Sequence, residues 1–174
     1  MDEKSLISKS DCNHKGSETH HHYRLFLSNR KITMLEVKVN NKFVKAESFQ
    51  KPITTNKLPK IYIIKNGDKI IYVGIASQSI INRLRYGFAA KGKGGYHGYR
   101  WKDLKERLDL LIWCFSGESL NYIESIEAEI VFAIRHETGQ WPSYQTEIHF
   151  HNVTNEEKEL AQRIYKQAKA VNEH

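Results

Sequence analysis

Two tyrosines flank a predicted tight turn. Tyr62 stands in the segment Lys60–Lys65 and Tyr72 in the segment Lys69–Gly74, and Asn66-Gly67-Asp68 joins the two segments. Asn-Gly between β-branched apolar runs is a strong signal of a β-hairpin. In such a hairpin the two phenols can lie near each other across the ladder, and the side-chain period of two decides whether they share a face. The alternative is that both tyrosines simply pack, as they commonly do in strands.

A guanidinium follows eleven residues after Tyr72. Arg83 lies in a helix that apolar spacing predicts from about Ser79 to Phe88. Its planar, permanently charged group is suited to clamping a phosphate. Arg85 lies about 200° further round such a helix, so the two arginines cannot serve one site equally. The alternative for Arg83 is an exposed, salt-bridging side chain.

A carboxylate points inward from a second predicted helix, Ser119–His136. At about 100° per residue, Glu127 lies within the apolar stripe of this helix, Glu124 at its edge and Glu129 outside it. A carboxylate on an apolar face is costly unless it is paired or bound to metal. One divalent cation, Mg²⁺ or Mn²⁺, is therefore predicted at Glu127, with Glu124 as second choice. The alternative is a buried ion pair with an Arg or Lys.

Positive charge is concentrated between Ile80 and Lys105, a segment that contains seven basic residues and one acidic residue, Asp103. The whole chain carries a net charge of +7. Such clustering favours a phosphate-binding surface. A glycine-rich loop, residues 91–98, can bring backbone amides close to a phosphate, although it can also be a flexible surface loop. The predicted nucleic-acid contacts, which include the stacking faces of two tyrosines, are Arg85, Lys91, Lys93, Tyr96, Tyr99, Arg100 and Lys102.

These residues together resemble the GIY-YIG nuclease superfamily. Lys60-Ile61-Tyr62 corresponds to the first half of that name, with Lys in place of the usual first Gly. Tyr72-Val73-Gly74 corresponds to the second half, with Val for Ile. Arg83 follows at about the family spacing and a helical glutamate completes the set. The resemblance covers about residues 60–145, half of the chain.

The resemblance implies a role for each residue. Tyr62 would act as, or help position, the general base that activates water, and Tyr72 would orient the water or contact the phosphate. Arg83 would stabilise charge on the phosphoryl oxygens, and Glu127 would hold the metal. His97 is the counterpart of a His or Tyr that some members carry near the arginine.

Three further polar residues follow the long helix. Gln145 stands in the region where the family more often has Asn, and it is a weak candidate for the site. His149 and His151 share one face of a predicted strand, residues 147–151, and could bind a metal. Packing or hydrogen bonding is the favoured alternative, since no third ligand has a clear spacing.

The order of predicted elements indicates an α+β domain with a small, mostly antiparallel three-stranded central sheet flanked by helices. An N-terminal hairpin begins at residue 31, a short helix spans 99–107 and a buried strand 108–115. A last helix follows the capping-box residues Thr154 and Glu157. Residues 1–30, which are polar and include His20-His21-His22, are expected to form a flexible tail, and residues 31–174 a single nuclease domain.

Composition narrows the class of protein. The 174 residues suffice for one domain with a substantial core. No apolar run approaches the roughly 18 residues of a membrane span, and the first ten residues lack the pattern of a secretory signal. The two cysteines, Cys12 and Cys114, offer no disulfide framework, which fits a reducing cytosol. We expect a cytoplasmic protein.

The favoured hypothesis is a metal-dependent DNA endonuclease. The missing first glycine leaves open a catalytically inactive nucleic-acid-binding module of the same fold, and a toxin-like RNase is a third reading. Because each chain would carry one active site, cleavage of both strands would favour a homodimer or two successive nicks.

Overall fold

The computed structural model describes residues 19–171. Within this range the chain forms the strands β1 (His21–Ser28), β2 (Lys31–Val39), β3 (Lys42–Lys45), β4 (Lys60–Asn66), β5 (Lys69–Ala76) and β6 (Arg107–Cys114). It also forms the helices α1 (Ile80–Ala89), α2 (Leu120–Thr138) and α3 (Asn155–Ala170) and a short 3₁₀ turn, η1 (Lys93–Gly95). Across residues 19–171, no helix combines the length and apolar character that crossing a bilayer requires.

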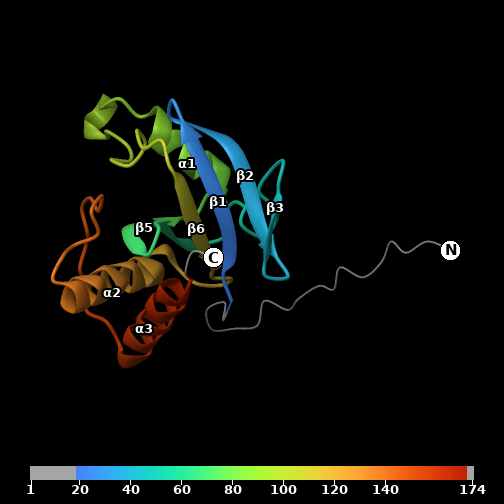
Figure 1. The fold of residues 1–174 in the computed structure, drawn as a ribbon. Coiled ribbons are helices and arrows are strands. Elements are labelled where there is room, and N and C mark those ends of the chain that lie inside the picture. The colour runs from blue at the N-terminus through green and yellow to red at the C-terminus, as the bar shows by residue number, and fades with distance from the viewer. Residues whose placement is uncertain (1–18, 172–174) are drawn as a thin grey trace.

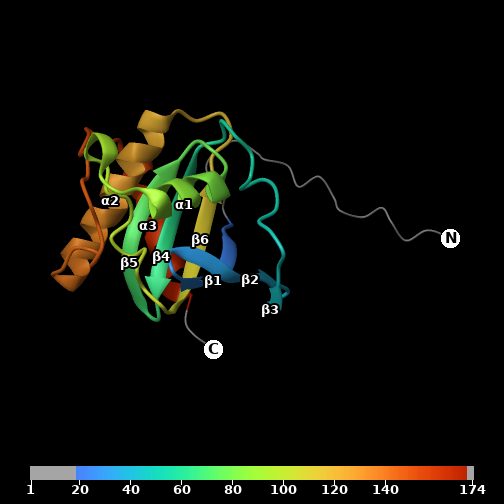
Figure 2. The ribbon, with the colours of Figure 1, turned by 90° about the horizontal axis from the view of Figure 1, so that it is seen from above.

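All six of these strands belong to one sheet in the order β3-β2-β1-β6-β4-β5, and each neighbouring pair is antiparallel (Figure 1). Helix α1 lies against one face, and α2 and α3 lie against the other, so that the sheet is the middle of three layers (Figure 2). The predicted α+β class is confirmed. The predicted three-stranded sheet is too small, because the N-terminal strands extend the same sheet instead of standing apart from it.

The side-chain alternation along β4 distributes its residues between two cores. Ile61 and Ile63 pack with α2 and α3, whereas Tyr62 and Ile64 pack with α1. This is the period of two expected for a strand that is covered on both faces. The candidate tyrosine Tyr62 therefore lies on the α1 side of the sheet.

Strand β1 corrects the expectation of a flexible tail over residues 1–30. Its segment from residue 21 to 28 is inserted between β2 and β6, and Tyr23, Leu25 and Leu27 are buried. The polar residues between them obscured this alternation. His22 and Arg24 are buried because both contact Asp109 of β6, at 2.6 Å and 3.4 Å. Residues 1–18 lie outside the described residues.

Two other predicted elements are absent from the described residues. Residues 99–106 form turns and irregular chain rather than a helix, and Arg107 already begins β6. The buried aromatic rings of Tyr99 and Trp101 hold this segment against α1. The segment 147–151 is irregular and largely exposed rather than a strand. Residues 144 and 145 already occupy the open edge of β5, so this segment has no strand to pair with.

Short-range interactions define the end of α2 and the start of α3. Gly139 ends α2 with a φ of 74°, a left-handed conformation that glycine adopts without strain. Thr154 caps α3, since its side chain accepts from the Glu157 N–H and the Glu157 carboxylate accepts from the Thr154 N–H. The predicted start of the last helix after Thr154 is confirmed, and α2 extends two residues beyond its predicted end at His136.

Lys60, which replaces the usual first glycine of the motif, has a structural role. Its side chain is buried, and its ammonium group donates to the carbonyls of Thr55 at 2.7 Å, Leu58 at 2.7 Å and Gln78 at 3.1 Å. These three bonds use all three protons of the ammonium group. Burial lowers the pKa of Lys60. The residue joins the connector before β4 to the loop that leads into α1.

We expect Lys60→Met to lower the free energy of unfolding by about 2–4 kcal/mol, since it leaves three carbonyls without their donor. Urea unfolding followed by circular dichroism measures the change. Lys69→Met, at an exposed position near the turn of the same hairpin, is the matched control and should change stability by less than about 0.5 kcal/mol. Equal stability of the two variants would contradict the role given to Lys60.

Candidate active site

A one-residue bulge in the β4–β5 hairpin decides where the two tyrosines point. The register runs regularly from Lys60↔Ala76 to Ile64↔Tyr72 and then shifts, so that Lys65 pairs with Ile70 and Ile71 is the extra residue. Without that shift the register of the turn would pair Tyr62 with Val73, and Tyr62 and Tyr72 would lie on opposite faces. The bulge therefore brings both phenols to the α1 face.

Gly74 provides the space for this pair of rings. It lies directly opposite Tyr62 in the ladder, and the centroids of the Tyr62 and Tyr72 rings are 5.9 Å apart. A Cβ atom on Gly74 would lie 2.6 Å from Tyr62 Cζ and 2.7 Å from Tyr72 Cε1. The glycine of the Tyr-Val-Gly motif is thus required because the two phenol rings fill the volume of its missing side chain.

Tyr99 is the third phenol of the cluster. Its hydroxyl lies 2.7 Å from that of Tyr62, and its ring packs edge-on against both Tyr62 and Tyr72. A Cβ on Gly87 of α1 would lie 2.1 Å from the Tyr99 ring. The ring therefore packs against α1 only because residue 87 is a glycine. The prediction that Tyr99 stacks on nucleic acid is wrong, because its side chain is 1% exposed.

Arg83 extends from α1 over the aromatic cluster. Its Nη1 donates to the Tyr96 hydroxyl at 2.9 Å, and its Cζ lies 5.3 Å from the centroid of the Tyr99 ring. Burial alone would lower the pKa of Arg83, but interaction with Tyr62 and Tyr99 outweighs burial and raises it. Arg85 is exposed on another side of α1, as the helical spacing predicts.

Glu127 of α2 interacts electrostatically with two members of the same site, Tyr72 and Arg83. Within residues 19–171 its carboxylate forms no hydrogen bond or ion pair, and it is partly buried. Burial, reinforced by the charge of Glu124, raises the pKa of Glu127 to about 8, and Arg83 acts in the opposite direction. Glu127 also contributes to raising the pKa of Tyr72, so the carboxylate, the guanidinium and the phenols form one electrostatic unit.

Glu124, the second choice for the metal, already has a partner. Its Oε2 lies 2.7 Å from Nε2 of His151. His149 lies 3.9 Å from Glu147 and is exposed, so the two histidines contact different acids. No group of three or more His, Cys, Asp or Glu side chains is arranged to hold a metal in the part of the chain that the structure describes.

The phenols of the cluster are held in their protonated form. Burial raises the pKa of Tyr62 well above 10, and the neighbouring Tyr99 raises it further, while Arg83 opposes the shift. Burial and Tyr62 likewise raise the pKa of Tyr72 well above 10. At neutral pH the site therefore presents hydroxyl groups rather than phenolates.

The other predicted contacts divide into buried and exposed groups. The Lys102 ammonium donates to the carbonyls of Ala90 at 2.8 Å and His97 at 2.6 Å, so it ties the glycine-rich loop together rather than standing free for phosphate. The side chain of His97 is exposed beside Gly92. Tyr96 is half-buried, and Lys91, Lys93 and Arg100 are exposed.

Gln145 holds the outer edge of β5. Its amide oxygen accepts from the Val73 N–H at 3.0 Å, and its amide nitrogen donates to the Val73 carbonyl at 2.9 Å. The adjacent Tyr144 N–H donates to the carbonyl of the bulge residue Ile71 at 2.9 Å. Gln145 therefore supports the strand that carries Tyr72 instead of entering the cluster.

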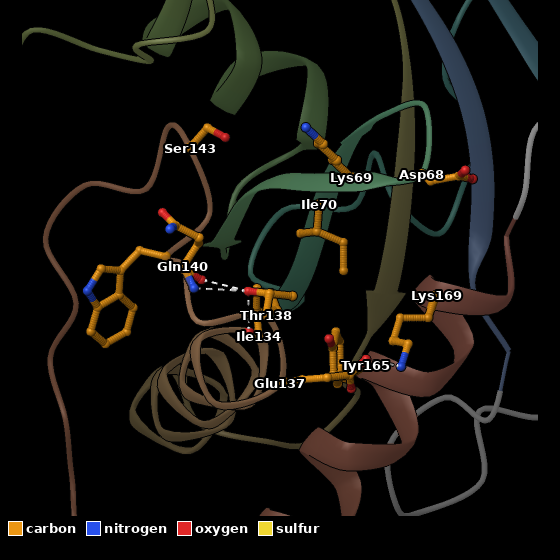
Figure 3. A pocket seen from close by; sticks show the side chains of 11 residues that line it. Asp68, Lys69, Ile70, Ile134, Glu137, Thr138, Gln140, Ser143, Tyr165 and Lys169 are labelled. Atoms are coloured by element: carbon orange, nitrogen blue, oxygen red, sulfur yellow. Dashed lines mark hydrogen bonds and ion pairs between the residues drawn. The ribbon is translucent and has the colours of Figure 1, made fainter.

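A pocket of about 700 Å³ lies elsewhere, on the side of the sheet covered by α2 and α3 (Figure 3). It is lined by the β4–β5 turn, the end of α2 and part of α3, including Ile70, Ile134 and Tyr165. Glu137 and Lys169 form an ion pair at its wall. None of the tyrosine cluster lines this pocket, so its volume does not identify the site.

Comparisons of the chain with protein family models, with curated proteins and with solved structures find no match. The likeness to GIY-YIG nucleases therefore depends on the residues and the geometry described above.

We expect Gly74→Ala to destabilise the fold by about 1–3 kcal/mol, because the new methyl group overlaps both phenol rings. Urea unfolding measures the loss, and near-ultraviolet circular dichroism reports the displaced tyrosines. Val73→Ala, on the same strand but in the opposite core, should lower stability with an unchanged tyrosine spectrum. A Gly74→Ala spectrum identical to the wild type would show that the rings do not depend on this glycine.

Proposed function

We propose that this chain is a metal-dependent endonuclease that hydrolyses phosphodiester bonds in DNA, with a GIY-YIG-like core over about residues 60–145. The observation that carries the proposal is the bulge that brings Tyr62 and Tyr72 to one face, where Arg83 and Glu127 interact with them electrostatically. In this core, β6, β4 and β5 correspond to the three-stranded sheet and α1 and α2 to its flanking helices.

The hydrolytic step requires an attacking water, a stabilised phosphoryl group and a proton for the leaving oxygen. The attacking water loses one proton to solvent as its oxygen forms a bond to phosphorus, the bond from phosphorus to a sugar oxygen breaks, and the leaving sugar oxygen takes up one proton from solvent. Tyr62 and Tyr72, as protonated phenols, hydrogen-bond and orient the water. Arg83 stabilises the negative charge that grows on the phosphoryl oxygens. The raised pKa of Tyr62 favours this positioning role over that of a phenolate base.

One protein ligand, the Glu127 carboxylate, has the chemistry to bind a divalent cation. The carboxylate is partly buried, has no hydrogen-bonding partner among residues 19–171 and has its pKa raised to about 8. A bound cation supplies the positive charge that such a carboxylate lacks. When bound, Mg²⁺ or Mn²⁺ would polarise the phosphate and stabilise the leaving oxygen. Glu127 would be its ligand from the protein.

The exposed charge suits a polyanionic substrate. Arg85, Lys91, Lys93 and Arg100 are exposed around the cluster's side of the sheet, and the one acid of this segment, Asp103, is paired with Arg30 at 2.6 Å. The positive charge of this segment is therefore not offset locally by a free carboxylate. Phosphate contacts of this kind contribute most of the affinity in nucleic-acid binding.

One observation favours a second function, nucleic-acid binding without cleavage. The side chain of Tyr62 is fully buried, and its hydroxyl is already bonded to Tyr99. Water reaches this phenol only if the Tyr62–Tyr99 contact opens. Binding that persists in both Mg²⁺ and Mn²⁺ with no product would support this function, and faster cleavage of RNA than of DNA would support the RNase reading.

Incubation of the purified protein with supercoiled plasmid tests the proposal. We expect nicking with Mg²⁺ or Mn²⁺ and none with EDTA. Arg83→Ala should slow nicking by about 10²–10³-fold, because the guanidinium would no longer stabilise the negative charge on the phosphoryl oxygens in the transition state. Tyr62→Phe should slow it by at least about tenfold through loss of the hydroxyl. Glu127→Gln should abolish the response to the metal.

Matched variants separate chemistry from folding. Tyr23→Phe removes another buried hydroxyl, one that accepts from the Gln50 N–H, and Glu129→Gln alters a glutamate outside the apolar stripe of α2. Both should nick at the wild-type rate. Arg83→Lys keeps the charge but loses the planar fork and should fall between wild type and Arg83→Ala. Full activity of Tyr62→Phe, Arg83→Ala and Glu127→Gln together would reject the proposal.

The pKa of Glu127 predicts a pH dependence of metal binding. Because it is raised from 4.5 to about 8, the folded chain retains a proton that the unfolded chain loses, so this group lowers stability as pH rises through that window. A cation that binds the carboxylate reverses the loss. Thermal unfolding should show a small gain in Tm with Mn²⁺ at pH 6 and a larger gain at pH 8.

Two variants check this assignment without measuring activity. Glu127→Gln should lose the gain in Tm at both pH values and should exceed the wild type in Tm at pH 8 without metal. Glu129→Gln should keep the wild-type response. An equal Mn²⁺ effect on Glu127→Gln and on wild type would assign the cation to another residue.

A further inference from the structure

Two tyrosine rings form a parallel stack on the surface beside the cluster. Tyr86 of α1 and Tyr96 of the glycine-rich loop have ring centroids 5.0 Å apart and planes inclined by 8°. Tyr86 is 58% exposed, whereas Tyr96 is half-buried beneath it. An exposed ring held parallel to a second ring offers a flat apolar surface to solvent. This is the geometry on which nucleobases stack in single-strand-binding proteins.

The stack is directly connected to the candidate active site. The Tyr96 hydroxyl accepts a hydrogen bond from Arg83 Nη1 at 2.9 Å, and Tyr86 follows Arg83 by three residues on the same face of α1. Side chains at this spacing start about 5–6 Å apart, a distance that one nucleotide spans between its base and its phosphate. A base on Tyr86 is therefore compatible with a phosphate at Arg83.

The surroundings of the stack carry the complementary charge. Lys91 and Lys93 precede Tyr96 in the same loop, Arg100 follows it, and all three are exposed. The Tyr96 N–H donates to the Lys93 carbonyl at 3.4 Å, which keeps that lysine next to the stack. An aromatic face bordered by cations fits a nucleotide better than it fits an apolar peptide.

We propose that an unpaired nucleobase stacks on the outer face of Tyr86, next to the phosphate that is cleaved. This inference rests on the proposed nuclease function and specifies its substrate class: a strand with an unpaired base at the cleavage site, as in single strands, flaps and junctions. It also replaces the predicted stacking on Tyr99, whose ring is buried, with stacking on a tyrosine that the sequence pattern did not single out.

Equilibrium binding measured by fluorescence anisotropy in EDTA tests the proposal without cleavage. The probes are a labelled thymidine oligonucleotide, an abasic strand with the same phosphate spacing, the matching blunt duplex and the same sequence as RNA. We expect the wild type to bind the thymidine strand about tenfold more tightly than the abasic strand, a difference of about 1.4 kcal/mol. The blunt duplex should bind more weakly than the thymidine strand.

Tyr86→Ala should weaken binding of the thymidine strand about tenfold and leave binding of the abasic strand unchanged. Tyr86→Phe, which keeps the ring, should bind like the wild type. Phe132→Ala removes a similarly exposed ring from α2 and is the matched control. Equal affinity of the wild type for the thymidine and abasic strands, or of Tyr86→Ala and wild type for the thymidine strand, would overturn the proposal.

The outcomes separate this inference from the proposed function. Stacking-dependent binding without any cleavage in Mg²⁺ or Mn²⁺ would reject the nuclease and retain the base-binding site. Cleavage of plasmid with no dependence on Tyr86 or on the presence of bases would retain the nuclease and reject the site. A stronger Tyr86 dependence for RNA than for DNA would keep the stacking site and assign RNA as its ligand.

Discussion

One residue, Ile71, is the extra, unpaired residue of the β-bulge in the β4–β5 hairpin. The geometry of the candidate site follows from this bulge. A strand presents successive side chains to opposite faces, so a shift of one residue between β4 and β5 exchanges the faces. With the bulge, Tyr72 lies on the same face as Tyr62, and Gly74 lies opposite Tyr62. Without it, the two rings would belong to different cores, and Tyr99 could not pack against both.

Burial opposes charge throughout this cluster. It raises the pKa values of Tyr62, Tyr72 and Glu127, and Arg83 acts against all three shifts. The phenols of Tyr62 and Tyr72 are therefore neutral, and the Glu127 carboxyl group retains its proton to a higher pH than usual. These groups interact with one guanidinium, that of Arg83. Such an arrangement holds its protons tightly and is stabilised by added positive charge. In the function proposed above, a divalent cation would supply positive charge on the Glu127 side of the cluster and a phosphate would supply negative charge on the Arg83 side.

Local signals in the sequence predicted much of the fold, and distant contacts account for what they missed. The hairpin, α1, β6, α2 and α3 follow from turn residues, apolar periodicity and caps that operate within a few residues. Strand β1 could not be predicted in this way, because His22 and Arg24 look like surface residues until Asp109, which is 87 and 85 positions away, pairs with both.

The same limit applies to the site. Tyr62, Tyr72, Arg83 and Glu127 could be selected from residue type and spacing. The register between the tyrosines could not, since the bulge depends on packing on both faces. Tyr99 was assigned to the surface because aromatic residues beside lysines suggest stacking. The contact between its ring and Gly87 is twelve residues distant in sequence and places it in the core.

The amide of Gln145 pairs with Val73 as a neighbouring strand would, and this has a consequence for how the molecule behaves in a crowded solution. Exposed edges of β-sheets template the addition of strands from other chains. Here one end of the sheet is occupied by Gln145 and Tyr144, and the other is β3, a strand of four residues with a lysine at each end. Both ends therefore leave little open edge on which a strand from another chain could add.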